Sequence, residues 1–191
     1  MSRHSTNWMI YGAYGYTGQL IAKQAIAEGF RPILAGRDPG RTEALAQELG
    51  CPFRAFSLDQ PEFSATNLAD VALVLNCAGP FMETAQPMIQ ACVRLGVHYL
   101  DITGEWKVIE HAARQDERAK AAGSIIMPAV GFDVVPSDCL AVQLATALPT
   151  ACNLELAFQV SLPPVIDDAR QPSQFAKSRR KGPQAGPHLA K

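Results

Sequence analysis

A glycine-rich turn between a short apolar run and a helical pattern is the feature that most constrains this chain. Residues 8–11, WMIY, are apolar, and glycines follow at positions 12, 15 and 18. From Gln19 onward, apolar residues recur at helical spacing. The pattern predicts a strand, a tight turn and a helix. Such a turn presents free backbone N–H groups and a helix N-terminus, which together suit a phosphate group.

Each of the three glycines has a separate predicted role. Gly12 permits the tight turn, and Gly15 lets a pyrophosphate approach the backbone without a Cβ in its way. Gly18 lets the helix pack closely on the strand. The spacing is GxxGxxG and not GxGxxG. A glycine-rich turn without a ligand therefore stays open as the alternative to a dinucleotide site.

The end of the next predicted strand indicates which dinucleotide would bind. Residues 31–37, RPILAGR, contain a buried run and end in Arg37. NAD-selective sites carry an acidic residue at the end of this strand, whereas an arginine accommodates the 2′-phosphate of NADP. A guanidinium can donate two hydrogen bonds to that phosphate. Arg37 therefore favours NADP(H), and the alternative is a solvated arginine paired with Asp38.

Strands and helices alternate along most of the chain. Further strands are predicted at 53–58, 71–79, 98–103 and 124–130, and further helices at 41–49, 83–95, 106–122 and 136–147, with a short helical turn near 62–68. This alternation predicts an α/β fold, a doubly wound parallel sheet of the Rossmann type. We assign it to a first domain over residues 1–150.

The pattern changes after residue 150. Residues 153–161 alternate between apolar and polar side chains, which predicts the first strand of a second, α+β domain over 151–161. Residues 162–191 hold five prolines and a basic excess, and we expect a disordered tail there. A strand with one uncovered apolar face favours a homodimer or self-association.

Composition limits the possible partners and compartment. The 191 residues carry a net charge of −1, so the charge favours neither nucleic acid nor a membrane. The sequence has no long apolar stretch and no secretory signal. Five cysteines without a CxxC pair and four scattered histidines indicate reduced thiols, a cytoplasmic protein and no metal site.

Polar residues at the predicted strand ends are the remaining site candidates, because ligands bind at the carboxyl ends of parallel strands. Asp59 can accept a hydrogen bond from an adenine amino group or cap a helix or turn. The turn Asn76–Pro80 can lie under a nicotinamide ribose or be a plain turn without a ligand. Carboxylates at Asp101, Glu105 and Asp133 can serve as proton donors or substrate anchors, or simply cap helices and turns. No catalytic residue is assigned.

Five motifs together resemble the saccharopine dehydrogenase-like oxidoreductases, including bacterial members described as trans-acting enoyl reductases. They are GAYGYTG (12–18), AGRD (35–38), NCAGPF (76–81), YLDITGE (99–105) and GFDVVPSD (131–138). The resemblance covers residues 7–160. It implies an NADP(H) site formed by Gly12, Tyr14, Gly15, Tyr16, Thr17, Gly18, Arg37, Asp59, Ala78, Gly79 and Pro80.

The resemblance also implies a function, hydride transfer to or from a C=N, C=O or C=C bond of an unidentified small-molecule substrate. Members of the family are longer, and residues 162–191 depart from their pattern, so we expect a C-terminally truncated chain. The alternative is then a non-catalytic NADP-binding remnant or redox-sensing module. A third possibility, a semialdehyde dehydrogenase-type reductase, needs a cysteine nucleophile opening a helix beside a base. Neither Cys77 nor Cys139 has a histidine nearby in the sequence.

Overall fold

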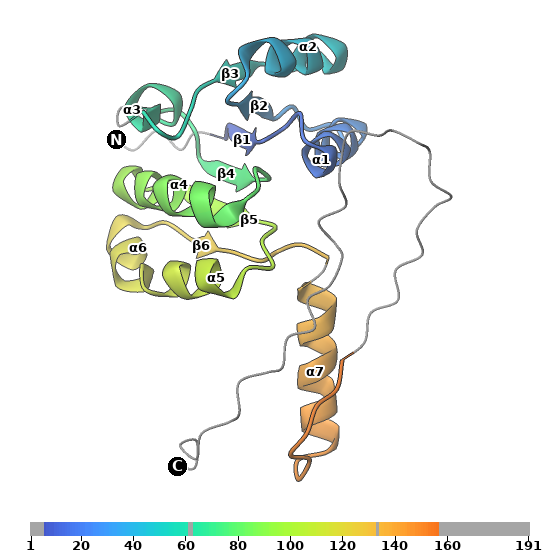
Figure 1. Ribbon diagram of the computed structural model, residues 1–191. Coiled ribbons are helices and arrows are strands. Elements are labelled where there is room, and N and C mark those ends of the chain that lie inside the picture. Colours follow the sequence, from blue (N-terminus) through green and yellow to red (C-terminus); the bar gives the residue numbers. More distant parts are fainter. Residues whose placement is uncertain (1–5, 61–62, 133, 157–191) are drawn as a thin grey trace. The chain divides into compact units, whose positions relative to one another are not determined.

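The computed structural model describes residues 6–60, 63–132 and 134–156 (Figure 1). Six strands alternate with helices along the chain. The strands are β1 (Trp8–Tyr11), β2 (Ile33–Gly36), β3 (Phe53–Ala55), β4 (Leu73–Asn76), β5 (His98–Asp101) and β6 (Ile126–Met127). The helices are α1 (Tyr16–Ala27), α2 (Pro39–Leu49), α3 (Phe63–Asn67), α4 (Phe81–Leu95), α5 (Trp106–Ala113), α6 (Asp116–Ala122) and α7 (Val135–Ala147).

The strands form one sheet in the order β3-β2-β1-β4-β5-β6. Every pair of neighbouring strands is parallel. In register, Tyr11 lies beside Asn76, and Asn76 lies beside Asp101, so the carboxyl ends of β1, β4 and β5 are level. The order reverses between β1 and β4, which is the place where doubly wound sheets bind their ligands. The predicted α/β fold with a doubly wound parallel sheet is confirmed.

Alternating side chains of the strands build a core on each face of the sheet. On one face, Ile10 and Leu34 are buried with Ala22 of α1 and Leu45 of α2. On the other face, a larger cluster joins β1, β2, β4 and β5 to α4, α5 and α6. Figure 1 shows these three helices beside β4, β5 and β6. Strands that are buried on both faces read as continuous apolar runs, as the sequence of β1 and β2 does.

The structure departs from the predicted elements in one helix and in most boundaries. The predicted helix over 106–122 is two helices, because the Gln115 N–H donates to the Ala112 carbonyl oxygen at 2.9 Å, a bond between residues three apart that ends α5 before α6 begins at Asp116. Gln115 is buried and its Oε1 accepts a hydrogen bond from Arg118 Nη1 at 2.9 Å. Neither Gly nor Pro marks this break, so sequence pattern could not reveal it. Several strands are shorter than predicted, and α1, α2 and α4 each start earlier than predicted.

The region beyond α7 is described only in part. Residues 151–156 form no strand in the described structure, so the strand predicted for 153–161 is absent from its described half. Residues 157–191, including the predicted tail, and Asp133 lie outside the described residues. The domain boundary near 150, the disordered tail and self-association therefore stay predictions.

Candidate functional site: a cleft between the β1–α1 and β4–α4 turns

Two of the three glycines in the β1–α1 turn are required by close backbone packing. Gly12 has φ +82°, and a Cβ there would lie 2.7 Å from the Ala78 backbone nitrogen. A Cβ on Gly18 would collide with the Gly12 carbonyl oxygen. The turn after β1 therefore touches the turn after β4, and Gly18 at the start of α1 packs directly against the first of these turns.

Gly15 differs from the other two, because within the described residues its close contact is limited to one backbone oxygen. It is the N-cap residue of α1, with φ −71° and ψ 162°, and a Cβ there would lie 3.2 Å from the Gly12 oxygen as its one close contact. Within the described residues, no side chain caps α1 and no acidic residue lies in its first turn. The free N–H groups and the positive end of the helix dipole are thus left for an anion.

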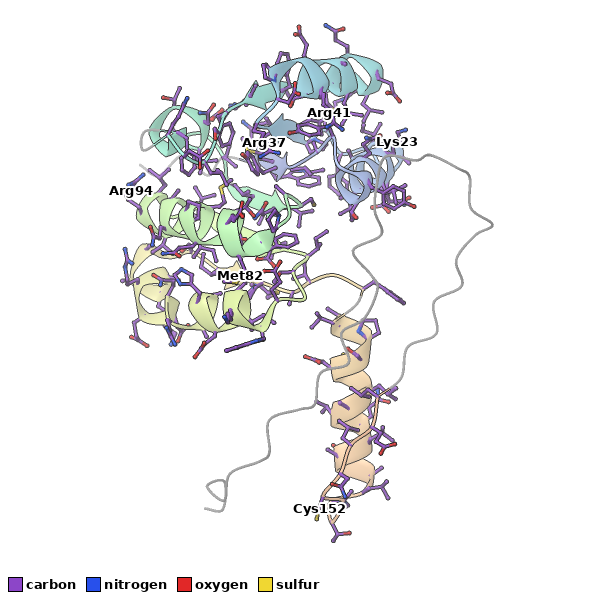
Figure 2. The ribbon with its side chains drawn as sticks, in the orientation of Figure 1. Lys23, Arg37, Arg41, Met82, Arg94 and Cys152 are labelled. Atoms are coloured by element: carbon purple, nitrogen blue, oxygen red, sulfur yellow. The ribbon has the colours of Figure 1, made fainter. Side chains whose placement is uncertain are left out.

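The end of β2 carries two arginines and a carboxylate. Arg37 follows β2 directly, and Figure 2 shows it with Arg41 of α2. The Asp38 carboxylate caps α2, since its Oδ1 accepts a hydrogen bond from the Arg41 backbone N–H at 3.0 Å. The Arg41 guanidinium carbon lies 4.4 Å from the centre of the Tyr14 ring. Both positive charges therefore stand at this strand end, and the nearest carboxylate is engaged in capping.

Tyr11 forms the floor of the cleft between these groups. Its hydroxyl donates a hydrogen bond to the Phe56 carbonyl oxygen at 3.1 Å. Burial raises the pKa of Tyr11 to about 12, with further upward contributions from Tyr14 and Asp59 and a downward one from Arg37. Asp59 itself is exposed and accepts a hydrogen bond from the Ser57 hydroxyl at 2.9 Å. Tyr11 is therefore a neutral, structural hydroxyl at physiological pH.

A cavity of about 180 Å³ lies between the turns that follow β1, β2 and β4. Of the residues predicted to bind the cofactor, six line it: Gly12, Tyr14, Gly15, Arg37, Ala78 and Gly79. Gly18 is buried where α1 packs on the β1–α1 turn, whereas the remaining four residues are exposed and are not among those that line the cavity: Tyr16, Thr17, Asp59 and Pro80. Cofactor contact by any of these eleven residues stays a prediction. The cavity is also lined by Cys77, within the turn 76–80 that the sequence proposed for the nicotinamide ribose, and by Tyr11, Gly36 and Thr84, which the sequence did not single out.

The β4–α4 turn is held in place by side chains from its own neighbourhood. Asn76 is fully buried, and its Oδ1 accepts a hydrogen bond from the Ala78 N–H at 3.0 Å. The Thr84 hydroxyl donates to the Ala78 carbonyl oxygen at 2.5 Å. Burial, with a smaller contribution from the charge of Asp101, raises the pKa of Cys77 to about 12. A thiol that is neutral at physiological pH is a poor nucleophile, so Cys77 lacks the property a reductase of the semialdehyde dehydrogenase type requires.

Asp101 is a buried acceptor that holds three groups at the ends of β5 and β6. Its Oδ2 accepts from the Tyr99 hydroxyl at 2.8 Å, and the Asn76 amide in turn donates to that hydroxyl at 3.2 Å. Its Oδ1 accepts from the backbone N–H groups of Thr103 at 3.0 Å and Ala129 at 2.9 Å. With these bonds the carboxylate is committed to the fold and has no exposed surface.

Glu105 reaches across to a helix other than its own. It stands at the N-cap position of α5, but its carboxylate accepts hydrogen bonds from two backbone N–H groups at the start of α4. The donors are Phe81, at 3.1 Å, and Met82, at 3.0 Å. Sequence spacing gives no signal for a contact over 24 residues. Figure 2 labels Met82 at the start of α4.

The described residues contain no group of three or more His, Cys, Asp or Glu side chains arranged to hold a metal ion. Within the described ranges, no helix combines the length and apolar character needed to cross a membrane.

The sheet order, the glycine turn and the uncapped start of α1 define a Rossmann-type, NAD(P)-binding domain. More specifically, residues 8–127 match the family model "Saccharopine dehydrogenase NADP binding domain", and the chain belongs to this family. The predicted family is confirmed. Residues 8–127 are thus the NAD(P)-binding domain of a saccharopine dehydrogenase-like oxidoreductase.

Curated relatives from plants and bacteria share this region. A probable mitochondrial saccharopine dehydrogenase-like oxidoreductase of Arabidopsis thaliana is 33% identical over 147 residues, which cover 68% of this chain and 32% of the relative. A trans-acting enoyl reductase of Mycobacterium leprae is 33% identical over 144 residues, covering 71% of this chain and 34% of the relative. The chain thus spans about a third of the length of these relatives.

Solved structures agree with the fold. Saccharopine dehydrogenase (L-Glu forming) from Saccharomyces cerevisiae aligns with a TM-score of 0.63 at 17% identity, covering 75% of this chain and 31% of that one. A Citrobacter triphenylmethane reductase complexed with NADP(H) aligns with a TM-score of 0.51 at 18% identity. That match covers 64% of this chain and 48% of the reductase. Both alignments support the Rossmann-like architecture.

Proposed function

We propose that this chain binds NADPH in preference to NADH. The observation that carries the proposal is the charge arrangement at the end of β2. Arg37 lines the cavity, Arg41 stands above Tyr14, and the Asp38 carboxylate caps α2. A 2′-phosphate gains a charge-assisted partner there, whereas the ribose 2′-hydroxyl of NADH finds no carboxylate at the position of Arg37.

The proposed binding mode uses the whole cleft. The pyrophosphate lies at the uncapped N-terminus of α1, close to Gly15, and the nicotinamide half extends toward the β4–α4 turn. The cofactor supplies the hydride chemistry, and the protein supplies orientation and electrostatics. We place the domain in an oxidoreductase that moves a hydride between nicotinamide C4 and a C=N, C=O or C=C bond of a small molecule.

Fluorescence titration with NADPH and NADH tests the cofactor assignment. Wild type should bind NADPH at least about tenfold more tightly, which corresponds to roughly 1.4 kcal/mol, within the range of one charge-assisted hydrogen bond. Arg37→Ala should remove most of this preference. Arg114→Ala is the matched control, because Arg114 pairs with Glu110 on the exposed surface of α5. Equal affinities of the wild type for the two cofactors would contradict the proposal.

Turnover is a separate measurement. Loss of nicotinamide absorbance with an imine, an aldehyde or an enoyl compound would identify the class of acceptor. Binding of NADPH without turnover of any of the three would instead favour the alternative prediction, a non-catalytic NADP-binding module.

A further inference from the structure

The turn between β4 and α4 determines the shape of the cleft opposite the glycine turn. The Ala78 backbone lies where a Cβ on Gly12 would stand, so any movement of Ala78 changes the width of the cleft. Ala78 and Gly79 also line the cavity. In the binding mode proposed above, this turn faces the nicotinamide half of the cofactor, and the inference that follows rests on that proposed function.

The start of α4 has no side-chain cap from its own N-cap residue. Its N-cap residue is Pro80, which has no side-chain acceptor and makes no capping hydrogen bond in the described structure. The Glu105 carboxylate supplies the missing cap, with one oxygen on the Phe81 N–H and the other on the Met82 N–H. Hydrogen bonds from backbone N–H groups to a carboxylate at a helix N-terminus are among the stronger ones in proteins.

Glu105 is in turn fixed by a chain of hydrogen bonds to the sheet. Its backbone N–H donates to the Thr103 hydroxyl at 3.0 Å, and the Thr103 N–H donates to Asp101. Asp101 also holds Ala129, on the segment after β6, through its backbone N–H. The start of α4 is therefore tied to the ends of two further strands. Because Glu105 and the start of α4 are already held in place, little conformational entropy is lost there when a ligand binds, which is the basis of preorganisation.

We propose that Glu105 is a positioning residue for the nicotinamide half of the cofactor. Its carboxylate clamps the first turn of α4 and so holds Ala78, Gly79 and Pro80 in the shape that receives the nicotinamide ribose. The adenosine half is bound at the end of β2, which Glu105 does not contact. Removing the carboxylate should therefore weaken binding of the nicotinamide end alone.

Two ligands separate the two ends of the cofactor. NADPH contains both halves, whereas 2′-phospho-ADP-ribose keeps the adenosine, the 2′-phosphate and the pyrophosphate but has no nicotinamide. Titration calorimetry with each ligand should show that Glu105→Ala weakens NADPH about tenfold or more, while 2′-phospho-ADP-ribose changes by less than about twofold. Glu105→Gln, which keeps one acceptor oxygen, should fall between wild type and Glu105→Ala for NADPH.

A matched control and a second readout complete the test. Glu83 is an acidic residue in the same first turn of α4 and is exposed, so Glu83→Ala should leave both affinities unchanged. The fluorescence of bound NADPH should shift toward that of the free cofactor in Glu105→Ala. Equal weakening of both ligands, or of neither, would overturn the positioning role. If wild type bound neither ligand, the proposed function would fail, which is a different result from a failure of Glu105 alone.

Discussion

The two helices that start on either side of the cleft treat their free N–H groups in opposite ways. α1 follows β1 and has neither a capping side chain nor an acidic residue in its first turn, within the described structure. α4 follows the adjacent strand β4, and two of its first N–H groups are taken by Glu105. Both helices have a positive N-terminal end. The fold thus leaves one helix start open for an external anion and closes the other with its own carboxylate.

This difference shows why two similar βα turns in one sheet need not be two phosphate sites. A helix N-terminus attracts an anion only where the chain has not already satisfied it. The glycines leave the first N–H groups of α1 accessible, whereas at the start of α4 the Glu105 carboxylate already accepts two of the first N–H groups. One pyrophosphate site at the switch between β1 and β4 is what one dinucleotide requires.

The largest effect should come from closing the space between the two turns. Gly12→Ala places a Cβ against the Ala78 backbone and forces an L residue to φ +82°. We expect a loss of about 2–4 kcal/mol in the free energy of unfolding, together with loss of NADPH binding. Urea denaturation and fluorescence titration measure the two effects.

Gly29 provides the control for this variant. It has a similar backbone angle, φ +87°, but a Cβ there meets no atom within 4 Å. Gly29→Ala should therefore cost only the conformational strain, about 1–2 kcal/mol, and should leave NADPH binding intact. If the two variants lost equal stability, the close contact between the turns would be wrong.

A smaller effect on stability, with a large effect on binding, is expected at Gly15. Its backbone angles suit any residue, and a Cβ there would meet just the Gly12 oxygen. Gly15→Val should change the free energy of unfolding by no more than about 1 kcal/mol, yet remove detectable NADPH binding, because its side chain occupies the open start of α1.

A Gly15→Val protein with normal far-UV circular dichroism and normal NADPH affinity would mean that α1 binds no pyrophosphate.

The smallest effect concerns the protonation state of the Cys77 thiol in the β4–α4 turn. The pKa of Cys77, raised to about 12, keeps the thiol predominantly neutral over the physiological range, so the reactive thiolate is a very small fraction there. Iodoacetamide at pH 8 should therefore label the exposed Cys139 and Cys152 well before Cys77, as followed by mass spectrometry of the peptides. Labelling of Cys77 as fast as Cys139 would contradict both the burial of the Cys77 thiol and its raised pKa.

The sequence predicted the open side of the cleft, the β1–α1 turn with the uncapped start of α1, better than the closed side, the β4–α4 turn whose helix Glu105 caps. The roles of Gly12, Gly15 and Gly18 follow from local backbone geometry, which a short motif encodes. The structure shows that the three glycines differ in packing. Gly12 and Gly18 have no room for a Cβ, whereas a Cβ on Gly15 would meet a single backbone oxygen. The importance of Gly36 was missed, because the side chain that occupies its space comes from Tyr14, on another turn.

The closed side depends on contacts between residues far apart in the chain. Glu105 was considered as a proton donor or as a residue suited to the first turn of its own helix, whereas its carboxylate contacts α4. Asp101 was a candidate for chemistry and is instead a fully buried acceptor. Periodicity and caps report neighbours along the chain, and they carry no information about which loops meet at a sheet edge.

The packing of Tyr14 over Gly36 limits how cofactor preference can change during evolution or engineering. A Cβ at Gly36, the last residue of β2, would run into the Tyr14 ring, on whose face Arg41 stacks. An acidic residue at this position would displace the ring and the second arginine before it reached a ribose. If the proposed NADPH preference holds, a change toward NADH is therefore expected to succeed more readily at Arg37 than at Gly36, because Gly36 is packed against Tyr14 and, through it, against Arg41.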